Sequence, residues 1–202
     1  MTLVLAALLA AAPVTLEADP AHTTAGFAVK HMVVTTVRGE FTKVNSTLHW
    51  NKDDPSRSNV DVKIDAASIN TNNEKRDTHL KSPDFFDAQK CPEITFKSNR
   101  VEKAGGDTFK VTGDLTMHCV TKPVTLQVQF ADQPVKSPWG TTVYAANATG
   151  KIKRSEWGLN WNKALESGGV LVSDDVNLDL DVEYIAKPAE GKKEAQAESK
   201  AK

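Results

Sequence analysis

The chain has 202 residues, of which 40% are hydrophobic and 25% charged, which is the size and composition of one or two globular domains. Its 25 basic and 26 acidic side chains leave a formal net charge of −1. There is no overall positive field to attract nucleic acid or an anionic membrane, and no local cluster of basic and aromatic residues replaces it. We therefore expect no nucleic-acid partner.

The first predicted element is an N-terminal apolar run. Residues 3–14 contain only leucine, valine, alanine and one proline, too short a run to span a bilayer but typical of the core of a secretory signal peptide. The alanines at 10–12 suit a cleavage site, and a second possible site follows Ala18. We predict a signal peptide over residues 1–18, a periplasmic or secreted location and no transmembrane segment. The alternative is a buried N-terminal segment of the fold, because no positive charge lies near Met1.

Most of the chain after this run alternates apolar and polar residues. The pattern is clearest at 60–66, 124–130 and 176–184, and it predicts antiparallel strands with one buried and one solvent-exposed face. Between Phe41 and Val44 the apolar residues change parity, which predicts a bulge or bend. With five weaker strands we expect eight in total; the weaker ones lie at 22–32, 36–50, 93–103, 108–119 and 141–154.

Two segments lack this alternation. Residues 73–89 predict one or two short helices, with Ser82 as an N-cap before Pro83 at a first helical position. Residues 188–202 contain no large apolar side chain, so we expect this tail to be disordered. The folded domain is then expected over residues 19–187.

Eight antiparallel strands favour closure into a barrel, which removes exposed sheet edges. Alternation alone does not separate a barrel from a sandwich. The connection at 155–161 carries two tryptophans and a leucine, whereas connections are usually polar, so it is suited to cover the mouth of a barrel. A ninth short strand or a core plug fits the same residues.

Several ordered motifs identify a family resemblance. They are HTTAGFAVKHM at 22–32, VRGEF at 37–41, INT at 69–71 with Arg76-Asp77, LKSPDFFD at 80–87, and TGDLT with VTKPV between 112 and 124. Together they resemble the YceI-like polyisoprenoid-binding proteins over about residues 16–184. The resemblance implies a lipocalin-like, eight-stranded antiparallel barrel whose elongated pore holds an isoprenoid, quinone-type or other long-chain lipid. It also implies periplasmic or secreted location and no established catalytic residues.

The residues offer little support for catalysis or metal binding. No Gly-x-Ser-x-Gly elbow frames a serine, and the five histidines are scattered without His-x-x-x-His spacing. We expect no enzyme, no cofactor and no metal site. The main hypothesis is an exported carrier or reservoir for a long-chain lipid. The alternative is a stress or interaction protein whose barrel is filled by side chains, and a hydrolase with an unrecognised site is a weaker third.

The candidates for lining the pore are large apolar residues, each of which has plain core packing as its simpler interpretation. They are Phe27, Val29, Phe41, Phe85, Phe86, Phe96, Leu115, Trp157, Leu159 and Trp161. Four polar residues are candidates for a head-group contact: His31, Arg38, Arg76 and Lys81. For Arg76, an ion pair with Asp77 is the favoured interpretation.

The two cysteines flank a predicted hairpin that turns at Gly105-Gly106. If Phe96 faces Leu115, then Cys119 lies opposite Pro92, and strict alternation sends the two thiols to opposite faces. A bulge near Pro92 would restore the same face. In the resembling family a large residue is common at Cys91 and a glycine at Cys119, which suggests that the two sites are close. We predict a Cys91–Cys119 disulfide.

Overall fold

The structure is a computed structural model that describes residues 13–166 and 169–186. Strands dominate, and the described residues include one α-helix and three short 3-10 helices. The strands are β1 (Val14–His31), β2 (Thr35–Phe41), β3 (Val44–Trp50), β4 (Asn59–Asp65), β5 (Ile69–Asn70), β6 (Glu93–Gly105), β7 (Thr108–Met117), β8 (Val120–Lys136), β9 (Thr142–Lys153) and β10 (Val172–Ala186). The helices are η1 (Pro55–Arg57), η2 (Ala66–Ser68), α1 (Glu74–Lys81) and η3 (Arg154–Trp157).

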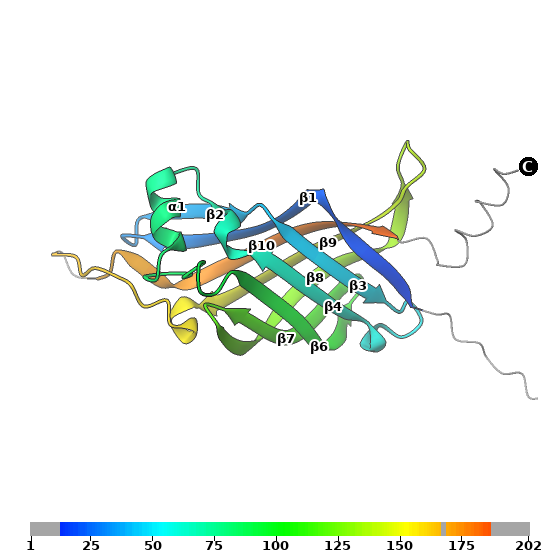
Figure 1. Cartoon of the computed structure of the whole chain (residues 1–202). Coiled ribbons are helices and arrows are strands. Elements are labelled where there is room, and N and C mark those ends of the chain that lie inside the picture. The colour runs from blue at the N-terminus through cyan, green and yellow to red at the C-terminus, as the bar shows by residue number, and fades with distance from the viewer. Residues whose placement is uncertain (1–12, 167–168, 187–202) are drawn as a thin grey trace, which may run out of the picture.

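The sheet closes on itself into a barrel (Figure 1). Its order is β10-β9-β8-β7-β6-β4-β3-β1-β2-β5, and β10 also pairs with β1. The closed ring is therefore made of eight strands, β1, β3, β4 and β6 to β10, and all its pairings are antiparallel. This confirms the predicted eight-stranded antiparallel barrel.

Strand β1 is long enough to pair with two successive neighbours on one side. Its first residues pair with β3, and its last seven pair with β2. The chain between β2 and β3 leaves the ladder at residues 42–43, where the change of apolar parity predicts a bulge. In β1 itself the register shifts between Ala18 and Thr23, around Pro20, which has no N–H to donate.

The barrel begins earlier in the chain than residue 19, the boundary expected from the sequence. Leu16 is 0% exposed and pairs with Leu48 of β3 and Ala186 of β10. Residues 14–18 are thus part of strand β1 and pair with its neighbours β3 and β10. Residues 1–12 of the predicted signal peptide and the predicted disordered tail lie outside the described residues.

Helix α1 covers one end of the barrel, the end where β1 turns into β2 (Figure 1). It begins after Asn73, whose side-chain oxygen accepts a hydrogen bond from Arg76 N at 3.0 Å, and it ends before Ser82. The expected N-cap role of Ser82 is wrong. Ser82 is extended because Pro83 follows, and its carbonyl accepts from Phe85 N and Asp87 N, so the chain forms turns there and no second helix. Among the described residues, no helix combines the length and apolar composition needed to cross a bilayer.

Candidate functional site

Three apolar chambers lie inside the barrel, with volumes of about 90, 100 and 110 Å³. We call them chambers A, B and C. Chamber A lies farthest from α1, chamber B is central, and chamber C lies beneath α1. Their defining residues are Ser46, Trp50, Phe109, Phe130 and Tyr184 for A; Ala25, Ile94, Phe96, Leu115 and Val124 for B; and Val29, Leu80, Phe85, Phe86 and Leu159 for C.

The chambers follow one another along a single strand. On β10, Val182 lines A, Leu180 lines both A and B, Leu178 lines both B and C, and Val176 lines C. These residues share parity because successive side chains of a strand point to opposite faces. From Val172 in C to Tyr184 in A the strand is about 40 Å long at its usual rise, or about 30 Å along the axis of a barrel with tilted strands. The chambers therefore form one row along the barrel, each sharing wall residues with the next, and we call this row the tunnel.

Glycines on the inner wall keep this tunnel open. A Cβ at Gly39 would lie 2.5 Å from Cζ of Phe27, and one at Gly113 would lie 2.6 Å from Cζ of Phe96. The tip of each phenylalanine ring thus lies directly against a glycine of the wall. A larger residue at Gly39 would press against the Phe27 ring, and one at Gly113 would press against both the Phe96 ring and the main-chain oxygen of Lys97.

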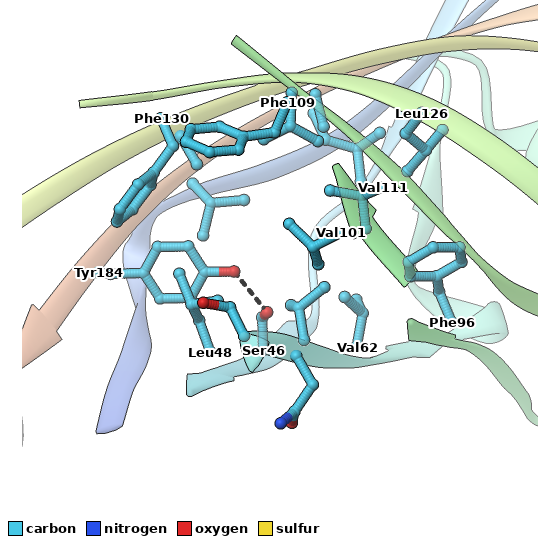
Figure 2. A pocket seen from close by; sticks show the side chains of 18 of the residues that line it. Ser46, Leu48, Val62, Phe96, Val101, Phe109, Val111, Leu126, Phe130 and Tyr184 are labelled. Carbon is cyan, nitrogen blue, oxygen red and sulfur yellow. Dashed lines mark hydrogen bonds between the residues drawn. The ribbon is translucent and has the colours of Figure 1, made fainter. Parts of the chain in front are cut away.

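Chamber A contains a buried polar pair (Figure 2). Ser46 Oγ and the Tyr184 hydroxyl share a hydrogen bond of 2.7 Å, and both side chains are buried. Burial raises the pKa of Tyr184 to about 12, although the hydrogen bond with Ser46 opposes the shift. The phenol is therefore neutral over the physiological range. Trp50, 6% exposed, packs its ring at 4.7 Å from Phe130 and 5.5 Å from Phe109 at the end of the chamber.

Chamber C contains a buried cation instead. The Arg154 guanidinium donates to the main-chain carbonyls of Ser173, at 3.0 Å, and Leu159. Burial lowers the pKa of Arg154, and the nearby Asp174 carboxylate opposes that shift. For Asp174, burial alone would raise the pKa, but hydrogen bonds from Ser155 lower it below its ordinary value. Arg154 thus ties η3 to β10 and to the connection that follows η3.

The α1 end of the tunnel is closed by an aromatic plug. Phe85 and Phe86 are buried, and Phe86 packs edge-on against Phe41 at 5.4 Å. The ring of Trp161 lies 5.3 Å from Phe85 and 4.8 Å from His79, on the side away from the chamber. A disulfide between Cys91 and Cys119, whose Cα atoms are 5.5 Å apart, links the plug segment to the β7–β8 turn.

A sequence profile described as the YceI-like domain matches residues 16–184 of the chain. This protein belongs to the YceI-like family. A UPF0312 protein of Staphylococcus aureus strain USA300 is 36% identical over 166 residues, which are 82% of this chain and 94% of that relative.

Two solved structures show the same fold. The Campylobacter jejuni YceI protein is 32% identical and superposes with a TM-score of 0.67, covering 79% of this chain and 90% of that one. A domain described as polyisoprenoid-binding, from Saccharophagus degradans, is 16% identical with a TM-score of 0.62, covering 87% and 99%. At 16% identity the second likeness shows the fold alone.

The barrel of this YceI-like protein brings most of the predicted pore residues together. Eight of the ten line chamber B or C, with Phe96 also reaching A; they are Phe27, Val29, Phe41, Phe85, Phe86, Phe96, Leu115 and Leu159. Trp157 and Trp161 line none of the three chambers. Trp157 is 1% exposed and donates its indole N–H to Leu115 O at 3.1 Å, so it packs into the barrel wall.

The four predicted head-group residues do not gather. Arg76 donates to Thr71 Oγ1 and Thr71 O, and Asp77 accepts from the same threonine, so the structure joins Arg76 to Asp77 through Thr71. Arg38 lines a polar groove on the outer wall. His31 ends β1, and Lys81 ends α1. None of the four lines a chamber.

Strict alternation along β7 would send the thiols of Cys91 and Cys119 to opposite faces, but this alternation does not apply to Cys119. Cys119 lies outside the strands, in the turn between β7 and β8, where it and His118 have positive φ of 58° and 51°. The predicted register, Phe96 opposite Leu115, is present. Because Cys119 is in a turn, its side chain does not have to follow the inward–outward order of β7.

Sequence reasoning missed the polar pair of chamber A. Ser46 has the inward parity of Val44, Leu48 and Trp50, so the alternation itself was a usable signal. A separate cluster of possible metal ligands is exposed at the β1 irregularity. There His22 Nδ1 lies 2.9 Å from Asp19 and 3.9 Å from Glu183, an arrangement that also serves as an ion-pair network.

Proposed function

We propose that this YceI-like protein is an exported binding protein that holds one long-chain isoprenoid, quinone-type lipid or related amphiphile as a carrier or reservoir. The observation that carries the proposal is the row of three apolar chambers along β10. The polyisoprenoid-binding domain of S. degradans, which has the same fold, supports it at the level of the family.

The tunnel offers enough apolar contact to bind a chain without a strong polar anchor. Each CH₂ group that is buried contributes roughly 0.8 kcal/mol to the free energy of binding. A lipid chain of tens of carbon atoms can therefore be held by apolar burial alone. Length and branching of the chain are then selected by the walls of the chambers, where Phe27 and Phe96 lie against Gly39 and Gly113.

The chambers favour this function over a barrel filled by side chains. In a barrel filled by side chains, inward-facing residues would pack across the whole interior, as Trp50 of β3 does against Phe130 of β8 at the end of chamber A. Along the rest of the interior three inner side chains lie against glycines of the wall, Phe27 against Gly39, Phe96 against Gly113 and Leu126 against Gly150.

Lipid extraction tests the carrier function. The full chain is purified from a Gram-negative host, extracted with organic solvent, and the extract is analysed by mass spectrometry. We expect about one long-chain lipid per protein. In Leu180→Trp the added indole should fill the junction of chambers A and B and reduce the bound lipid. Gln129→Trp, which adds the same group on the outer face, is the matched control.

The carrier function is wrong if the wild type yields no lipid and a long-chain prenol leaves its thermal midpoint unchanged. A ligand that binds only the native state must raise that midpoint.

Export is supported by the disulfide, because such bonds persist in oxidising compartments.

Since Leu16 is fully buried in β1, a leader that is removed must be cut before Val14. Expression of the full chain in a Gram-negative host, fractionation and intact-mass measurement test this. We expect periplasmic protein whose first residue lies no later than Val14. A cytoplasmic chain of full mass, or a cut after Ala18, contradicts it.

A further inference from the structure

The polar groups that line chamber A are all uncharged. Its lining includes Ser46, Trp50, Ser58, Asn59 and Tyr184 among apolar side chains, and within residues 13–166 and 169–186 no charged residue lines it. We propose that chamber A is the head-group subsite of the tunnel, that it takes an uncharged head bearing an oxygen acceptor, such as a quinone or an ester, and that Trp50, Ser46 and Tyr184 bind that oxygen. This inference rests on the proposed function, since it orients the lipid within the same tunnel.

The fold places the hydroxyl pair deep inside. Tyr184 is on β10 and Ser46 is on β3, the two strands that flank the first half of β1. On one side of β1, Ala18 pairs with Tyr184 of β10, and on the other side Glu17 pairs with Thr47 of β3. The two hydroxyls meet at 2.7 Å, and Figure 2 draws this hydrogen bond between Ser46 and Tyr184 inside the chamber.

The hydroxyl pair has hydrogen-bonding capacity left. Each hydroxyl has one proton and two lone pairs, and their mutual bond uses one proton. The second proton is therefore available to a ligand oxygen. A carbonyl oxygen placed beside the pair would accept it, and the chain of hydrogen bonds would then run through both residues.

Two buried polar atoms at this end have no hydrogen-bond partner in the part of the chain that the structure describes. They are Trp50 Nε1 and Thr23 Oγ1. Trp50 lines chamber A, and Thr23 pairs on β1 with Val182, which lines it too. Leaving a buried donor unpaired is costly, and an indole N–H can only donate. The missing partner of Trp50 is therefore an acceptor.

A charged head is poorly matched to chamber A. With no cation in its lining, a diphosphate there would lose its hydration without gaining a counter-charge. Arg154 is the one charged residue that lines any of the three chambers among the described residues, and it lies at the opposite end. Its guanidinium already donates to two main-chain carbonyls beside Asp174. An anionic head would have to compete with those contacts.

Three ligands with one tail separate these possibilities: geranyl benzoquinone, geranyl diphosphate and the corresponding hydrocarbon without a head group. Their dissociation constants are measured by calorimetry for the wild type, Tyr184→Phe, Trp50→Phe and Tyr144→Phe. Tyr144 is the matched control, because it is the other tyrosine of the chain, pairs with Tyr184 across β9 and β10, and is not a lining residue of chamber A.

We expect the wild type to bind the quinone at least tenfold more tightly than the hydrocarbon or the diphosphate. Tyr184→Phe and Trp50→Phe should each raise the dissociation constant of the quinone about tenfold, which corresponds to the loss of one good hydrogen bond. The dissociation constant of the hydrocarbon should stay within about twofold of the wild-type value. Tyr144→Phe should change none of the three.

The subsite is wrong if the quinone binds no better than the hydrocarbon, if the diphosphate binds as well as the quinone, or if the variants weaken all three ligands equally. In each of those cases the hydrocarbon still binds, so the carrier function stands. If none of the three ligands binds the wild type, the carrier function fails together with the subsite.

Discussion

At the α1 end the interior of the barrel is closed by Phe85, Phe86 and Leu159 and holds the buried cation Arg154, whereas at the other end it narrows onto Trp50 and a pair of neutral hydroxyls. The α1 end is fastened by covalent and main-chain contacts, which include the disulfide and the carbonyls that Arg154 binds. At the far end, two buried polar atoms have no hydrogen-bond partner among the described residues. One end is therefore fixed by its contacts, whereas the other keeps hydrogen-bonding groups for the head-group subsite that we propose.

The disulfide is the contact whose loss should be largest. On the chain-entropy model, a bridge that spans 28 residues stabilises the fold by about 3–4 kcal/mol. We expect Cys91→Ser with Cys119→Ser to lower the free energy of unfolding by that amount in a denaturant titration. Hydrogen exchange should rise first at residues 82–91 and least near Tyr184. Equal loosening at both ends would remove the distinction between them, and two free thiols in the unreduced wild type would rule out the bridge.

Alkaline pH should weaken the far end. The pKa of Tyr184 is about 12 in the folded protein against about 10 for an exposed tyrosine. Its contribution to stability is complete below pH 10 and is lost as pH rises through 12, which amounts to roughly 2–3 kcal/mol. We expect Tyr184→Phe to lose less stability than Tyr144→Phe over this range in parallel urea titrations. Identical pH profiles for the two variants would show that the Tyr184 phenol is not buried.

The glycines of the wall should be intolerant of a methyl group. Gly39→Ala would press against Phe27 and Thr71, and overpacking of this kind costs about 1–3 kcal/mol. We expect lower stability and weaker binding of long-chain lipids, because the displaced ring enters chambers B and C. Adding Phe27→Leu should restore binding. If the double variant binds no better than Gly39→Ala, the ring is not what blocks the tunnel.

The smallest expected effect concerns the irregularity of β1. The hydrogen bond to Asp19, with the charge of Glu183, raises the pKa of His22. The stabilisation is complete below the ordinary histidine pKa of about 6.5 and is lost as pH rises through the raised value. We expect an NMR titration to give a His22 pKa above 6.5 that falls in Asp19→Asn. An unchanged pKa in that variant would contradict the contact.

The sequence was most informative wherever a feature depends on local alternation. The break between Phe41 and Val44, where a bulge or bend was expected, and the pairing of Phe96 with Leu115 are both consequences of which face a residue occupies, so they could be predicted. With help from the family resemblance, eight of the ten predicted pore residues proved to line chamber B or C.

Features that depend on barrel closure could not be predicted in the same way. Ser46 and Tyr184 are 138 positions apart and meet because β1 pairs with β3 on one side and β10 on the other. Trp157 was placed at the tunnel because it is apolar and lies between strands. Its 3-10 helix η3 turns it into the wall, where its N–H finds a main-chain carbonyl.

The most direct test of the account is a crystal structure of the protein bound to a long-chain prenyl quinone that carries bromine at the end of its tail. Anomalous scattering locates the bromine without depending on how well the chain itself is seen. We predict continuous ligand density through chambers A, B and C, with the bromine in chamber C near Phe86 and the quinone beside Tyr184. Bromine outside the barrel, or chambers occupied only by separate water molecules, would contradict a single lipid tunnel.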